Sequence, residues 1–130
     1  MEYPNNFRYT TEHEWVAPTG NTAKIGISDF AQQQLGDIVF VELPAVGTVL
    51  NAGQSLGTVE SVKAVSEVFA PVSGKVKAIN DALVKSPELL NQDPHGKAWM
   101  VEVELTDPSQ AAKLMDAAAY TKFVAEAEAH

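Results

Sequence analysis

The residue whose type and position most clearly suggest a chemical role is Lys63, which lies between two valine-rich segments at 56–59 and 65–69. Because β-branched and aromatic residues favour paired strands, the pattern predicts a hairpin with Lys63 near its tip. An amine on a protruding, stiff turn can be presented to the active site of another protein, which a buried amine cannot. Nothing in the sequence suggests the buried, activated lysine of a catalytic nucleophile, so Lys63 suits the role of an acylation target better. On spacing alone, a solvated turn lysine with no further role is the commoner case.

The other titratable residues form no recognised catalytic or metal-binding motif. The three histidines, His13, His95 and His130, are far apart, and His13-Glu14 does not continue into H-E-x-x-H. Glu12 and Glu14 are expected on the same face of a strand, a spacing that could serve acid–base chemistry, although strand carboxylates are more often solvated. The absence of cysteine excludes structural disulfides, thiolate zinc sites and a cysteine nucleophile.

The composition indicates one compact globular domain covering residues 1–130, long enough to bury a core without metal or disulfides. A net charge of −8 argues against nucleic acid, which needs a basic footprint. No apolar run approaches the length that spans a bilayer, so we expect a soluble protein with no membrane association. The first residues resemble neither a secretory signal nor a transit peptide. We therefore expect the cytoplasm, or the mitochondrial matrix if the chain is a processed eukaryotic form.

Period-two patterns predict a mostly β protein, with further strands at 9–16, 23–27, 37–43, 48–50, 75–79 and 99–105. In the last strand, Trp99, Val101, Val103 and Leu105 are expected to form the apolar face, opposite Met100, Glu102 and Glu104.

Helices are expected to be short. Ser28 is a suitable N-cap for a helix over 29–35 that ends at Gly36. A single helical turn should begin at 86–87, followed by a loop at 91–96. Residues 107–108 should cap a helix, and the alanine-rich segment at 117–128 should be helical.

A short internal repeat suggests symmetry. Segments 44–49 and 71–76 share the pattern P-x-x-G-x-V, and Lys63 lies between them. Two copies of a strand–turn–strand unit predict two small sheets related by a pseudo-twofold axis.

Several motifs, taken together, resemble one known family. They are H-E-W-V at 13–16, I-G-I-S at 25–28, L-G-D-I-V-F-V-E-L-P at 35–44, E-S-V-K-A-V-S-E-V at 60–68 and A-P-V-S-G at 70–74. Lipoyl domains of 2-oxoacid dehydrogenases usually carry D-K-A at the corresponding turn, and biotinyl domains carry M-K-M. The chain is similar to the H-protein family of the glycine cleavage system, from Tyr9 to the C-terminal helix.

The resemblance implies a lipoyl/biotinyl-type hammerhead, or barrel-sandwich hybrid, of two small antiparallel sheets with short helices. The core would cover about 9–106 and a C-terminal helical extension about 107–130. Lys63 would carry lipoate in amide linkage. The surroundings of the attachment site would be Glu60, Ser61, Val62, Ala64 and Glu67. Glu14, with Glu67 and Glu12, would line a cleft that shields the arm.

The resemblance also implies a carrier rather than an enzyme, and we expect a monomer. The arm would take an aminomethyl group from the pyridoxal-phosphate enzyme glycine decarboxylase to the tetrahydrofolate-dependent aminomethyltransferase. Dihydrolipoyl dehydrogenase would reoxidise the dithiol, and a lipoate ligase or octanoyltransferase would load the lysine.

One loop departs from the family pattern, and two other functions stay open. The family motif D-P-Y-G-x-G-W is D-P-H-G-K-A-W at 93–99, with His95 and Ala98 replacing the tyrosine and the second glycine. One alternative is a lipoyl relay that passes lipoate to other carriers. Another is a hydrolase or isomerase built on Glu12, His13 and Glu14, which activity remaining after Lys63→Arg would support.

Overall fold

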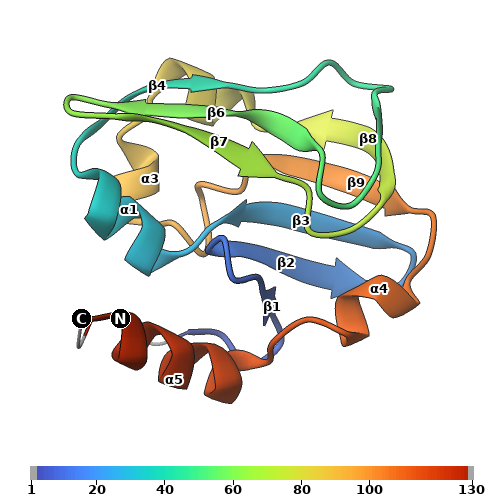
Figure 1. Ribbon diagram of the computed structural model, residues 1–130. Coiled ribbons are helices and arrows are strands. Elements are labelled where there is room, and N and C mark those ends of the chain that lie inside the picture. The colour runs from blue at the N-terminus through green and yellow to red at the C-terminus, as the bar shows by residue number, and fades with distance from the viewer. Residues whose placement is uncertain (1–2, 129–130) are drawn as a thin grey trace.

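The computed structural model describes residues 3–128, and its two antiparallel sheets pack as layers (Figure 1). The larger sheet has the order β1-β2-β3-β9-β8-β5 and the smaller the order β4-β6-β7. The strands are β1 (Arg8–Tyr9), β2 (Glu14–Thr19), β3 (Thr22–Ile27), β4 (Ile38–Glu42), β5 (Val49–Leu50), β6 (Ser55–Ser61), β7 (Val65–Phe69), β8 (Gly74–Ile79) and β9 (Val101–Leu105). The expectation of two antiparallel sheets with short helices is confirmed.

The helices are short except at the C-terminal end, and they lie outside the sheets (Figure 1). They are α1 (Asp29–Leu35), α2 (Asp81–Lys85), α3 (Leu89–Gln92), α4 (Ser109–Ala112) and α5 (Ala117–Glu128). The predicted start and end of α1 are confirmed, because Ser28 Oγ accepts the Ala31 N–H at 3.2 Å and Gly36 ends the helix at φ +80°. No helix within residues 3–128 combines the length and apolar character needed to cross a membrane.

The core lies between the two sheets and follows the alternation of their strands. Ile25 and Val103 contribute from the large sheet and Val41 and Val59 from the small one, all at most 1% exposed. Met100 departs from the expected alternation, because it is fully buried although we placed it opposite the apolar face. The strand begins only at Val101, so the alternation does not extend back to Met100.

The two copies of the internal repeat lie side by side. Their strands β5 and β8 pair antiparallel, with Val49 opposite Lys75 and Leu50 opposite Gly74. The backbone N–H of Gly47 donates to the carbonyl of Val76 at 2.8 Å, which continues this pairing. The repeat therefore marks segments that meet in space.

An aromatic cluster joins the C-terminal segment to the start of the chain. The rings of Tyr9 and Tyr120 stack with centroids 4.5 Å apart, which seats α5 on β1. Tyr9 and Met115 also exchange backbone hydrogen bonds. That the chain forms a single domain with a core at 9–106 stays a prediction.

The segment before β9 is more helical than the sequence indicated. Helix α2 was not expected, and its buried Leu83 shows that packing, rather than a strong cap, holds it. The turn expected at 86–87 becomes helical only at Leu89, and Asn91 lies in α3 rather than in a loop.

Candidate functional site

Lys63 is exposed in the turn between β6 and β7, at one end of the molecule (Figure 1). The predicted hairpin is present. Ser61 fixes the turn, because its Oγ accepts the backbone N–H groups of Lys63 at 3.3 Å and Ala64 at 3.1 Å. The backbone N–H of Ser61 in turn donates to the carbonyl of Ala64 at 2.8 Å. The amine is therefore carried on a hydrogen-bonded turn at the end of two paired strands.

The residues around Lys63 divide into one buried support and several exposed neighbours. Ser61 is buried beneath the turn. The other residues assigned to the attachment site all face solvent: Glu60, Val62, Ala64 and Glu67. A modifying enzyme could therefore contact these side chains without displacing any part of the core.

The Lys63 turn also rests on the segment that ends α1. The backbone N–H of Val62 donates to the carbonyl of Asp37 at 3.0 Å. A Cβ added at Gly36 would lie 3.5 Å from Cε of Lys63, so the lysine side chain passes over this glycine. The φ of +80° and ψ of −151° at Gly36 are almost restricted to glycine.

Asn91 holds that supporting segment in place. Its Oδ1 accepts the backbone N–H of Ile38 at 2.9 Å. Its Nδ2 donates to the carbonyl of Gly36 at 2.8 Å and to Oε1 of Gln32 at 2.9 Å. One side chain of α3 thus connects α1 to β4 beneath Lys63. We had not expected Asn91 or Gly36 to support the lysine, and only the role of Gly36 as a helix end could be recognised in the sequence.

Glu14 is a buried carboxylate placed between the sheets. Its Oε1 accepts a hydrogen bond from Thr10 Oγ1 at 2.6 Å, and its Oε2 accepts the backbone N–H of Phe69 at 3.2 Å. Burial raises the pKa of Glu14, and these two hydrogen bonds partly oppose that shift. Among residues 3–128, the groups that act on this pKa include the carboxylate of Glu12 but no cation. Among the described residues, hydrogen bonds rather than a cation therefore offset the burial of this carboxylate.

Glu12 and His13 do not join Glu14 in an acid–base site. Glu12 precedes β2 in an exposed turn where its backbone N–H donates to Thr10 Oγ1, so the expected common strand face is wrong. Nδ1 of His13 lies 2.8 Å from the hydroxyl of Tyr120, and burial lowers the pKa of His13. The hydrolase or isomerase hypothesis thus loses the paired carboxylates on which it was based.

The loop that departs from the family pattern lies against the start of α1. Nε2 of His95 accepts the backbone N–H of Asp29 at 3.0 Å, and burial lowers the pKa of His95. Ala98 is fully buried, so the methyl group that replaces the expected glycine is accommodated in the core. His130 lies outside the described residues.

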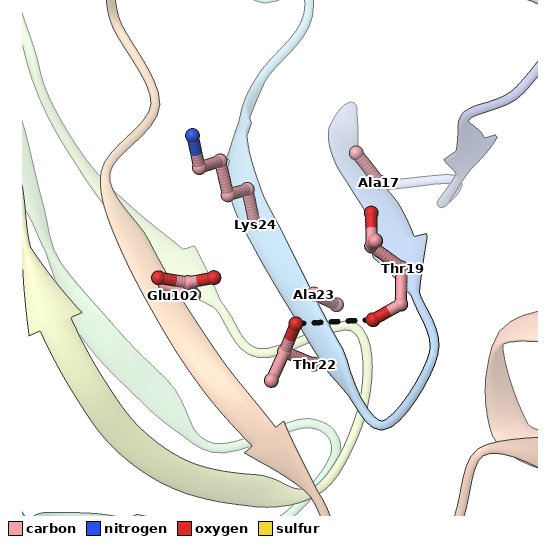
Figure 2. Close-up of a pocket in the computed structure, with 6 residues that line it drawn as sticks. All are labelled: Ala17, Thr19, Thr22, Ala23, Lys24 and Glu102. Atoms are coloured by element: carbon pink, nitrogen blue, oxygen red, sulfur yellow. Dashed lines mark hydrogen bonds between the residues drawn. The ribbon is translucent and has the colours of Figure 1, made fainter.

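A hollow over β2, β3 and β9 is separate from Lys63. Figure 2 shows its lining of Ala17, Thr19, Thr22, Ala23, Lys24 and Glu102. The β2–β3 turn lies at the end of the molecule opposite the Lys63 turn (Figure 1). Within residues 3–128 no group of three or more side chains is arranged to hold a metal ion.

Comparisons with known proteins agree over nearly the whole chain. A family model described as "Glycine cleavage H-protein" matches residues 7–127. A glycine cleavage system H protein of Koribacter versatilis is 59% identical over 130 residues, covering all of both chains. One from Bacillus cereus is 57% identical over 122 residues, covering 94% of this chain and 96% of its own. A crystal structure of a Mycobacterium marinum glycine cleavage system H protein matches with a TM-score of 0.85 at 35% identity, covering 97% and 99%.

Proposed function

The chain belongs to the glycine cleavage H-protein family, and on that basis we propose that Lys63 is its lipoyl attachment residue. As a member of this family it is the lipoyl-bearing shuttle protein of the glycine cleavage system, carrying an aminomethyl group between enzymes of that system. When bound, lipoate supplies a disulfide that can be reduced to two thiols, the atoms that hold the transferred group. The chain itself supplies position and protection.

The observation that supports this assignment is the exposed amine of Lys63 on a fixed turn. A rigid turn limits the positions that Nζ can take, so less ordering is required when a modifying enzyme binds it. The exposed neighbours Glu60, Val62, Ala64 and Glu67 form the surroundings of the attachment site.

We assign the shielding of the arm to Glu14, with Glu67 and Glu12 as further members of the cleft that the family resemblance implies. A buried carboxylate without a cation among its described neighbours gains more from an arriving ammonium than an exposed one would. Glu14 contacts β7 at Phe69, the last residue of that strand. The strand starts at Val65 near Lys63, and at roughly 3.3 Å per residue Phe69 lies about 13 Å further along it. The arm would therefore fold back along β7, and exposed Glu67 on that strand lies along the route.

The proposal includes the partners and the setting of the carrier. Glycine decarboxylase would load the arm, aminomethyltransferase would unload it, and dihydrolipoyl dehydrogenase would reoxidise it. A lipoate ligase or octanoyltransferase would acylate Lys63. The carrier would act as a monomer in the cytoplasm and would catalyse no step itself. A lipoyl relay to other carriers stays an untested alternative, since it depends on what other proteins do with the same arm.

Intact mass spectrometry tests the attachment residue. After incubation with lipoate, ATP and a lipoate ligase, the wild-type chain should gain the mass of one lipoyl group. Lys63→Arg should gain none, whereas Lys97→Arg, a change at another exposed lysine, should be modified like wild type. Modification of Lys63→Arg would refute the assignment.

A further inference from the structure

The outer face of the small sheet carries, near the Lys63 turn, a row of two apolar residues on either side of a glutamate. The strand register places Phe40 opposite Glu60, and Glu60 opposite Val65. Side chains directly opposite one another on paired strands point to the same face. The next row, with Val41 opposite Val59, is buried, so the row of Phe40, Glu60 and Val65 faces solvent. We call these three residues the outer row.

Both apolar members of the outer row are well exposed. Phe40 is 48% exposed and Val65 is 66% exposed. Val39, at the bulge in β4, and Val62, in the Lys63 turn, are also exposed. Single exposed apolar residues need no explanation, but a group beside the modified residue indicates a contact surface.

The charge of the same sheet defines the partner further. Strands β4, β6 and β7 contain Glu42, Glu60 and Glu67 but no lysine or arginine. All three glutamates are exposed. A partner that fits this face therefore offers an apolar surface for Phe40 and Val65 and a cationic side chain for Glu60.

We propose that the outer row is the docking surface for the enzyme that acylates Lys63, a proposal that rests on the assigned attachment residue. Acylation joins the deprotonated Nζ to the carbonyl carbon of an activated acyl donor, expelling the donor's leaving group and releasing one proton. The acylating active site must therefore reach the lysine side chain itself. Glu60 and Val65 are three and two residues from Lys63, and Phe40 lies opposite Glu60, so the outer row is the part of the sheet that an enzyme bound at the turn would meet first.

Enzymes that act on the loaded carrier have a different requirement. They work on atoms at the far end of the arm, which extends well beyond the turn. Contact with Phe40 and Val65 is consequently not required of dihydrolipoyl dehydrogenase. The outer row should thus affect loading of the carrier more than turnover of its arm.

Kinetics with matched variants test the proposal. With a purified lipoate ligase, Phe40→Ser and Val65→Ser should each lower kcat/KM for the carrier about tenfold, mainly through KM, as expected for losing a buried apolar contact. Phe40→Leu should restore most of the rate. Val49→Ser, at a valine that is 68% exposed in the other sheet, should match wild type.

A second assay separates docking from loss of fold. Each variant is lipoylated to completion with excess ligase, and its arm is then assayed with dihydrolipoyl dehydrogenase, where rates should stay within about twofold of wild type. Unchanged ligase kinetics in Phe40→Ser and Val65→Ser would overturn the docking proposal, and so would equal losses in both assays. If wild type is acylated at a residue other than Lys63, the proposed function fails instead.

Discussion

Oε2 of Glu14 accepts the backbone N–H of Phe69 at 3.2 Å, and this hydrogen bond joins the large sheet to the end of β7 in the small sheet. Connecting two sheets through a carboxylate that is only 3% exposed costs folding free energy, because burial disfavours its charge. The arrangement is understandable if the charge serves a ligand as well as the fold. Its cost to stability can be measured through pH.

The stability of Glu14→Gln relative to that of wild type should increase as pH rises. A raised pKa means that folded Glu14 binds a proton more tightly than the unfolded chain, whose glutamate pKa is near 4.5. Its contribution to stability is complete below that value and is lost as pH rises through the folded pKa. The free energy of unfolding of Glu14→Gln minus that of wild type should therefore increase from pH 4.5 to 8, as measured by urea denaturation.

Other titrating groups cancel in that difference, so its slope reports on Glu14. Glu12→Gln removes a charge from the exposed neighbour and separates the effect of net charge from that of burial. A difference that falls with pH would mean that the hydrogen bonds from Thr10 and Phe69 outweigh burial.

Asn91→Ala should destabilise the protein and loosen the Lys63 turn. The change leaves the backbone N–H of Ile38 and the carbonyl of Gly36 without their side-chain partner. Such losses typically cost about 1–3 kcal/mol. Hydrogen exchange at the amide of Val62, which bonds Asp37, should also become faster. Exposed Asn51 provides the control, since Asn51→Ala should change stability by less than about 0.5 kcal/mol. Unaltered exchange at Val62 would show that Asn91 does not support the turn.

How much of this site could be predicted differs from residue to residue. The hairpin around Lys63 follows from β-branched residues on both sides, and α1 follows from Ser28 and Gly36, because both signals are local. The support by Asn91 depends on a contact between residues far apart in the chain, which no periodicity reveals. Burial of Glu14 likewise depends on where β7 passes over β2, so the sequence could not separate it from exposed Glu12.

Glu60→Gln and Glu67→Gln should leave folding almost unchanged while impairing the carrier. Both side chains are exposed, and substitutions at such positions usually shift stability by no more than about 0.5 kcal/mol. We expect slower lipoylation, or faster loss of the group carried on the arm, measured by mass spectrometry over time. Glu104→Gln removes an equal charge from an exposed position on β9 and should behave like wild type. Global unfolding of either site variant would show that its side chain has a structural role.

His95→Gln should make the protein less sensitive to mild acid. Nε2 of His95 accepts the Asp29 N–H, so protonation removes the acceptor and introduces a charge in a partly buried place. Burial lowers its pKa, although the carboxylates of Asp29 and Asp93 act in the opposite direction. A lowered folded pKa contributes stability that is complete above the ordinary value of 6.5 and is lost as pH falls through the folded pKa.

Glutamine at position 95 keeps an oxygen acceptor for Asp29 but does not titrate. Between pH 7.5 and 5 the unfolding free energy of wild type should therefore fall more than that of His95→Gln, and the variant should keep the part of the slope that arises from His13, whose pKa is also lowered. Equal slopes would indicate that protonation of His95 costs the folded state nothing, and NMR titration of its ring protons would then show a pKa near the ordinary value of 6.5.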